Sequence, residues 1–191
     1  FASIDVLRFL AIFLVIAFHL LYNLYFDSGL RPIGFIGMSL FFMVSGFLLA
    51  KKYPKLTSFS LKWFLKRVLK IASLYYLTLV VLVVLLGKQV YSGSVVKNLV
   101  YHFLFIDFIS PETAYSIISP AWFLIPLIGL YFLYPFLNSS VKKSRSFLVI
   151  VFLIMIIVRF ADSTLTSYSF YAPLFFIGEF CFGLSYAYNK K

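Results

Sequence analysis

Apolar runs of nearly membrane-spanning length recur along this chain, and they constrain its fold more than any other feature. An α-helix needs about 20 predominantly apolar residues to cross the hydrocarbon core of a bilayer, where no water can bond an unpaired backbone. The runs that we interpret as spanning helices are Val6 to Tyr25, Ile33 to Ala50, Val68 to Leu86, Pro120 to Leu137, Phe147 to Phe160 and Tyr168 to Tyr188. The sequence therefore predicts an all-α fold, a polytopic transmembrane helix bundle of about six spans.

Composition agrees with this class, because 63% of the residues are hydrophobic and only 12% are charged. The net charge of +11 would also suit a nucleic-acid-binding protein, but the basic residues fall in short clusters between the apolar runs. We therefore exclude nucleic acid as a partner. Cys181 is the only cysteine, and no CxxC or HExxH spacing indicates a metal site. No repeat or linker divides the chain, so residues 1–191 are expected to form a single transmembrane domain.

Basic clusters predict the orientation of the bundle. The cluster that follows the second run contains Lys51, Lys52, Lys55, Lys62, Lys66, Arg67 and Lys70, and the positive-inside rule assigns it to the cytoplasm. The segment Val95 to Ile109 is apolar but short and carries ionisable residues, so we interpret it as interfacial or re-entrant rather than spanning. With that segment not crossing, the later basic clusters also fall inside. The N-terminus is then cytoplasmic.

Arg8 and His19 lie in the first apolar run and share one face of the predicted helix. A helix advances ~100° per residue, so eleven steps bring His19 within ~20° of Arg8 and ~16 Å further along the axis. Asp5 lies one turn before Arg8 on the same face. An ionisable group at membrane depth is costly and so indicates function. The pattern predicts an anchor at Arg8 and a proton acceptor at His19.

Four segments together resemble the N-terminal part of the membrane acyltransferase-3 family. They are Asp5-Val6-Leu7-Arg8 followed by His19, the stretch from Gly37 to Ser45-Gly46-Phe47, Arg67-Val68-Leu69-Lys70-Ile71, and Trp122-Phe123-Leu124 through Tyr131 to Pro135. The resemblance covers nearly the whole chain, but typical members continue through further helices. We therefore expect the chain to be an N-terminal fragment of a longer acyltransferase domain. Lys70 stands where the family often has an arginine, which keeps the charge but loses bidentate geometry.

The resemblance implies an activity and a set of site residues. Members move an acyl group, often acetyl from acetyl-CoA, onto a hydroxyl of a cell-surface carbohydrate or glycolipid. His19 and Arg8 are the expected catalytic residues, with Asp5 in support, and Arg67 and Lys70 are expected to bind the phosphates of the donor. No resident cofactor is expected, because acyl-CoA is a substrate. The expected partners are acyl-CoA, the carbohydrate or glycolipid acceptor and membrane lipids, in a bacterial plasma membrane.

Each of these residues also has a structural explanation. Arg8 can snorkel to lipid phosphate and pair with Asp5, and His19 can be a hydrogen-bonding residue between helices. Lys70 belongs to a stripe of lysines at i, i+4 spacing that suits an anionic-lipid anchor. The resemblance and the spacing favour catalysis for Arg8 and His19, whereas the two interpretations of Arg67 and Lys70 stay balanced.

Other ionisable residues near the apolar runs are expected to be structural. Glu179 lies in the last run, where a carboxylate needs a partner such as His19 or an arginine. We expect a structural pair that supports the site, with a catalytic role as the alternative. Arg159 is expected to snorkel at the end of its span. His102 and Asp107 are interpreted as interface residues without chemistry.

Small residues and prolines within the runs predict how the helices pack. Gly46 and Gly178 are expected to allow close helix approach. Pro126 is expected to kink its helix, which is tolerated where neighbours satisfy the freed carbonyl. Tyr75 and Tyr76 are typical of interfacial aromatic residues.

Two other functions fit the same residues. A transporter or flippase of a polysaccharide or glycolipid intermediate can use a membrane Arg and His for proton coupling. Such a protein predicts an inverted repeat, and the sequence shows none. A small structural membrane subunit is the third interpretation, in which Arg8 and His19 matter for folding alone.

Overall fold

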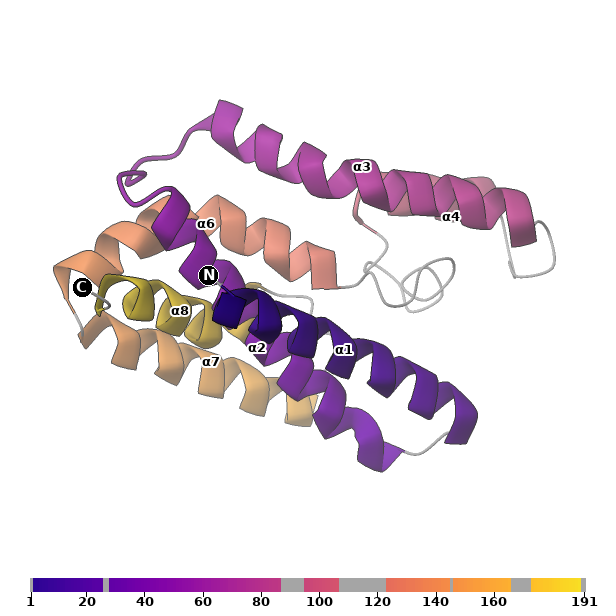
Figure 1. The fold of residues 1–191 in the computed structure, drawn as a ribbon, viewed down its shortest axis with the longest axis horizontal. Coiled ribbons are helices and arrows are strands. Elements are labelled where there is room, and N and C mark those ends of the chain that lie inside the picture. The colour runs from indigo at the N-terminus through magenta and orange to yellow at the C-terminus, as the bar shows by residue number, and fades with distance from the viewer. Residues whose placement is uncertain are drawn as a thin grey trace.

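The computed structural model describes residues 2–25, 28–86, 95–106, 123–144, 146–165 and 173–189 (Figure 1). The regular elements in these ranges are helices: α1 Ala2–Tyr25, the 3-10 turn η1 Ser28–Leu30, α2 Arg31–Lys52, α3 Leu61–Leu86, α4 Val95–Phe103, α6 Leu124–Lys143, α7 Ser146–Leu165, the 3-10 turn η6 Pro173–Phe176 and α8 Ile177–Asn189. No strand occurs within the described ranges. The predicted all-α class is confirmed.

Four helices are long and apolar enough to cross a membrane, namely α1, α2, α3 and α6. The apolar part of α7, Ser146–Ala161, is shorter, and α8 has 13 residues. Of the six predicted spans, these four therefore qualify by length and composition within the described ranges. The segment Val95 to Ile109 contains α4, whose nine residues are too few to cross a membrane alone.

α2 lies at the centre of the bundle because its backbone can approach α8 very closely. A Cβ built on Gly46 would overlap the carbonyl oxygen of Phe180, and one on Gly183 would overlap that of Met43. Only glycine permits this approach without moving a backbone. The predicted role of Gly46 in close packing is confirmed.

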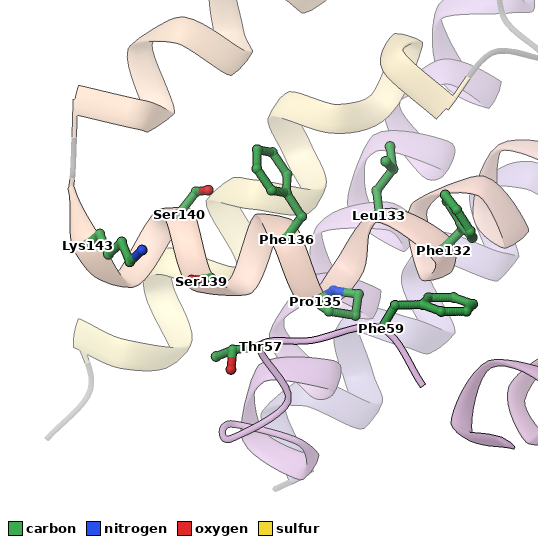
Figure 2. Close-up of a pocket in the computed structure, with 9 residues that line it drawn as sticks. All are labelled: Thr57, Phe59, Phe132, Leu133, Pro135, Phe136, Ser139, Ser140 and Lys143. Carbon is green, nitrogen blue, oxygen red and sulfur yellow. The ribbon is translucent and has the colours of Figure 1, made fainter. Parts of the chain in front are cut away.

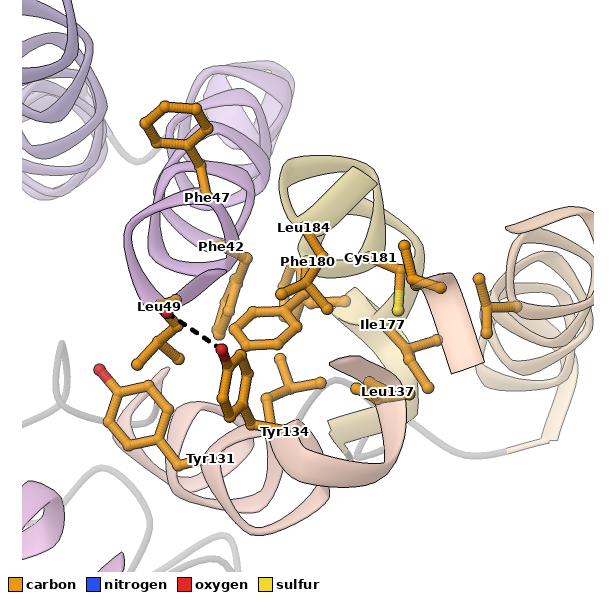
Figure 3. Close-up of a cluster of buried hydrophobic side chains, with 14 of the residues drawn as sticks. Phe42, Phe47, Leu49, Tyr131, Tyr134, Leu137, Ile177, Phe180, Cys181 and Leu184 are labelled. Carbon is orange, nitrogen blue, oxygen red and sulfur yellow. Dashed lines mark hydrogen bonds between the residues drawn. The ribbon is translucent and has the colours of Figure 1, made fainter. Parts of the chain in front are cut away.

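A buried core fills the space between α2, α6, η6 and α8 (Figure 3). The rings of Phe42 and Phe176 stack with their centroids 4.3 Å apart, and Phe180 is fully buried. The Tyr134 hydroxyl crosses from α6, and its one proton is shared between the carbonyl oxygens of Leu49 and Tyr53, at 3.0 and 2.9 Å. These bonds join the end of α2 to the middle of α6.

The same pattern of bonds continues down α6 and holds the loop between α2 and α3. The Asn138 amide donates to the carbonyls of Pro54 and Leu56 at 3.2 and 2.8 Å, and Lys142 also donates to Pro54. Tyr188 of α8 donates to the Asn138 side-chain oxygen. The ends of α2, α6 and α8 and the start of α3 therefore meet at one end of the bundle, which we call the lysine-rich end.

α3 leads away from the lysine-rich end and α6 returns to it. Phe64, near the start of α3, packs against Phe132 in the middle of α6, whereas the later residue Tyr75 shares a pocket with Phe123, just before α6 begins. The two helices thus run in opposite directions. This is the arrangement that the prediction of a non-crossing Val95 to Ile109 segment requires.

Pro126 does not kink α6. The helix begins at Leu124, so Pro126 lies in its first turn, where backbone N–H groups have no partner within the helix. The prediction of a kink there is wrong for this reason. The proline inside the helix is Pro135.

Candidate active site

A pocket of about 560 Å³ lies between α1, α2, α3 and α6. Its polar lining side chains are Arg8, Ser45, Arg67, Lys70, Tyr75, Thr78 and Tyr131, set among apolar ones such as Phe41, Leu48 and Phe123. Three of the cations proposed from the sequence, Arg8, Arg67 and Lys70, therefore meet in one place. None of the described residues in its wall is an Asp or Glu, so the lining carries net positive charge.

One face of α3 supplies most of the polar wall. Arg67, Ile71, Leu74 and Thr78 recur at spacings of three and four residues, which places them on one side of a helix. Lys70 lies on the same face, so the two cations of α3 occupy its first part and the hydroxyls of Tyr75 and Thr78 lie farther along. The helical period by itself thus places these residues on one side of α3.

The Arg67 guanidinium is held by aromatic rings. Its central carbon lies 4.8 Å from the centre of the Tyr53 ring and 5.9 Å from that of Tyr131. Its Nε is buried and has no hydrogen-bond partner in the described part of the chain. A buried donor without a partner is costly unless a ligand satisfies it. Arg67 is therefore suited to an anionic ligand.

Tyr53 reaches Arg67 because α6 fixes the loop that carries it. The Tyr134 hydroxyl bonds to the Tyr53 carbonyl, and Asn138 bonds to the carbonyls that follow it. The ring of Trp63 stacks on Tyr134 at 5.4 Å and meets Tyr53 edge-on at 5.7 Å. The core of the bundle thus sets the position of the pocket's most buried cation.

Arg8 makes the predicted contact with Asp5 and remains accessible. Its Nη1 lies 4.0 Å from Asp5 Oδ1, and both side chains are more than half exposed. A pair of this kind contributes little to stability, about 1 kcal/mol at most. The pair therefore leaves the Arg8 charge available to a ligand in the pocket.

His19 lies farther along α1, outside the pocket lining. Its ring is half-buried against Phe18, with centroids 5.0 Å apart, and Phe18 covers Gly34 of α2. α1 is helical from Ala2 to Tyr25, so the predicted rise of ~16 Å from Arg8 to His19 holds. The structure brings the three cations together and keeps His19 toward the opposite end of the helix.

Comparison with known proteins decides the family. The model of the acyltransferase-3 family, described as Acyltransferase domain, matches residues 1–191. The chain belongs to this family. It is therefore a membrane acyltransferase, as the resemblance of its motifs predicts. No curated protein and no solved structure matches the chain.

Glu179 of the acyltransferase pairs with an arginine and not with His19. Arg159 Nη2 lies 2.5 Å from Glu179 Oε1, and the Ser39 hydroxyl donates to the same oxygen at 3.1 Å. Arg159 Nε also donates to the Phe175 carbonyl, and the guanidinium lies over the rings of Phe175 and Phe176. The prediction that Arg159 snorkels is wrong, because these contacts turn it toward α8. The pair joins α2, α7 and α8 away from the pocket.

The sequence interpretation missed a polar pair at the pocket wall. His102 is fully buried, and its Nδ1 lies 2.8 Å from the hydroxyl of Tyr75, which lines the pocket. The structure adds this contact to the interpretation of His102 and Tyr75 as interface residues, which stays a prediction. A signal was present in the spacing, because Asn98 and His102 are one helical turn apart in a short apolar segment, and the structure buries both. Asp107 lies outside the described residues.

Proposed function

We propose that this acyltransferase takes an acyl group, acetyl in the simplest case, from acyl-CoA and transfers it to a hydroxyl of a cell-surface polysaccharide or glycolipid. The observation that carries the proposal is the pocket in which Arg8, Arg67 and Lys70 converge, with no Asp or Glu among the described residues of its lining. Coenzyme A is a polyanion with a diphosphate and a ribose phosphate. Guanidinium and ammonium groups form charge-assisted hydrogen bonds to such oxygens.

The pocket also suits the rest of the donor. Its volume of about 560 Å³ falls within the range of sites that bind small molecules and cofactors. Phe41, Leu48 and Phe123 supply apolar wall for the uncharged arm of coenzyme A, while the cations lie toward the lysine-rich end. The donor would bind with its phosphates at that end and its thioester pointing along α1.

His19 is the proposed base for the transfer. In the reaction the acceptor hydroxyl oxygen bonds to the thioester carbonyl carbon, the carbon–sulfur bond breaks, and the proton of the hydroxyl passes by way of His19 to the departing thiolate. The separation of ~16 Å between Arg8 and His19 is the length that the extended arm of the donor must bridge. Arg8 holds the phosphate end and His19 acts where the acyl group arrives.

Orientation follows from charge and from the donor. Coenzyme A is a cytosolic metabolite, and the lysine-rich end carries the clusters that the positive-inside rule assigns to the cytoplasm. We therefore assign the pocket mouth to the cytoplasmic face of a bacterial plasma membrane. His19, toward the other end of α1, would meet an acceptor on the external side.

The test is transfer of labelled acetyl from acetyl-CoA to glycan or lipid in membranes that contain the protein within its full parent chain. His19→Ala should abolish transfer at equal protein level, and Lys70→Gln should raise the KM for acetyl-CoA several-fold. Lys62→Gln is the matched control, because Lys62 is an exposed lysine of the same helix outside the pocket.

Two results would overturn the proposal. One is no transfer from any acyl-CoA while a glycolipid still crosses the membrane, which would favour a transporter. The other is an equal rise in the KM for acetyl-CoA in Lys70→Gln and Lys62→Gln. Lys70 would then act only as part of the general positive charge that attracts anions.

A further inference from the structure

A second cavity, of about 360 Å³, lies on the outer face of α6, against the loop that leads into α3 (Figure 2). Figure 2 shows Thr57 and Phe59 on the loop beside α6, on the same side as Pro135 and Ser139, whereas Leu133, Phe136 and Ser140 project from the other side of α6 in this view. It shares no lining residue with the candidate active site. We call this cavity the α6 groove.

The α6 groove is apolar at one end and polar at the other. Its apolar part is formed chiefly by the rings of Phe59, Phe132 and Phe136, which are about half exposed or more. Ring contacts hold them in place, with 5.1 Å between the centroids of Phe59 and Phe132 and 6.1 Å between those of Phe136 and Phe147. Phe132 and Phe136 belong to α6, which is long and apolar enough to cross a membrane.

Three hydroxyls and one ammonium group form the polar part, at the lysine-rich end. They belong to Thr57, Ser139, Ser140 and Lys143, and none of these side chains bonds to the described part of the protein. Lys142, by contrast, donates to the Pro54 carbonyl and lies over the Tyr188 ring. Lys143 is thus the lysine of this turn whose charge is left for a ligand, and no described lining residue is acidic.

We propose that the α6 groove binds one anionic phospholipid from the leaflet at the lysine-rich end. Its phosphate lies beside Lys143 and the hydroxyls of Ser139 and Ser140, and one acyl chain follows the phenylalanine rings. From Phe132 to Lys143 is eleven residues, about 16 Å of helix, which matches a headgroup and the upper part of a chain. The occupant is a lipid because the apolar part of the groove lies on α6, a helix that is long and apolar enough to cross a membrane.

The charge of Lys143 explains why the lipid would be anionic, and the hydroxyls and apolar walls of the groove explain why it would bind at this place. Each lysine near a membrane surface attracts anionic lipid by about 1 kcal/mol, but such attraction is spread over the whole lysine-rich end. The α6 groove adds hydroxyl donors at fixed positions and apolar walls, which only a lipid seated there can use. This inference is independent of the acyl donor and of the reaction.

The test uses a tryptophan placed in the groove wall. Phe136 is 63% exposed, so Phe136→Trp is accommodated without repacking the core. The variant is reconstituted in bilayers of dibrominated phosphatidylglycerol or dibrominated phosphatidylcholine, and the fluorescence quenching beyond that of the wild type is measured. We expect several-fold stronger binding of the anionic lipid at this position.

A matched pair of lysine substitutions separates a site from a charged surface. Added to Phe136→Trp, Lys143→Gln should remove the preference for phosphatidylglycerol, whereas Lys62→Gln removes the same charge outside the groove and should leave it. Equal quenching by the two lipids in the parent variant would overturn the proposal. So would an equal loss in the two lysine variants, because the preference would then come from the surface potential.

Discussion

The part of the bundle built by α2 and α8 differs sharply from the part that carries the pocket cations. Half of the spanning window of α2 is buried, whereas only 6% of that of α1 is buried and 17% of that of α3. α2 and α8 touch backbone to backbone at Gly46 and Gly183. α1 and α3 instead present their charged side chains to a pocket. The comparison teaches that burial is concentrated in one half and the cations of the pocket in the other, so we expect substitutions in the first to affect stability and those in the second to affect binding.

The largest effect should come from adding one methyl group between α2 and α8. Gly46→Ala places a Cβ against the Phe180 carbonyl, and backbone atoms cannot move aside cheaply. We expect a loss of about 2 to 3 kcal/mol in the free energy of unfolding, measured by denaturant titration in detergent. The control is Gly34→Ala, where the new Cβ meets the movable ring of Phe18 in α1. Equal losses of unfolding free energy in Gly46→Ala and Gly34→Ala would show that the contact of α2 with α8 is no less tolerant than its contact with α1.

A smaller loss is expected when a hydroxyl of the buried half is removed. Tyr134→Phe keeps the ring but leaves the carbonyls of Leu49 and Tyr53 without its bonds. The expected cost is about 1 to 2 kcal/mol in the same titration. Tyr25→Phe is the control, since Tyr25 is exposed at the end of α1. An unchanged stability of Tyr134→Phe would show that water replaces these bonds.

A substitution in the half that carries the pocket should weaken ligand binding and leave the free energy of unfolding unchanged. Arg67→Lys keeps the charge but loses Nε and the planar contact with Tyr53 and Tyr131. We expect the KM for acyl-CoA to rise about tenfold, or about 1.4 kcal/mol, with unfolding unchanged. Lys66→Arg, the reverse exchange at an exposed neighbour, should change neither. A fall in stability without a change in KM would make Arg67 structural.

The smallest effect is expected at the Tyr75 and His102 pair. Tyr75→Phe removes a hydroxyl that faces the pocket and bonds to His102. Tyr76→Phe removes the neighbouring hydroxyl, which bonds to the Phe103 carbonyl outside the pocket. Both should cost about 1 kcal/mol of stability, and only the first should lower kcat/KM, by a few-fold. If the two variants had equal kcat/KM, the role of the Tyr75 and His102 pair would be only to hold α3 and α4 together.

Much of the architecture could be predicted because lipid leaves the backbone few choices. Runs such as Ile33 to Ala50 must be helical when no water can bond their amides, and the structure has α2 there. The convergence of Arg8, Arg67 and Lys70 was also predictable, because charge clusters at one membrane face and the family motifs mark the same residues. Helical period alone places Arg67 and Thr78 on one face of α3.

Partners across the bundle could not be predicted in the same way. Spacing along one helix does not show which helix lies opposite, so Glu179 had several possible partners and only the packing of α7 against α8 selects Arg159. The burial of His102 likewise depends on how α4 lies against α3. The sequence by itself determined a helical membrane acyltransferase and its cations, because hydropathy, charge and motifs are local. The pocket, the ion pair and the α6 groove were decided by tertiary structure, because each needs side chains from segments that only packing brings together.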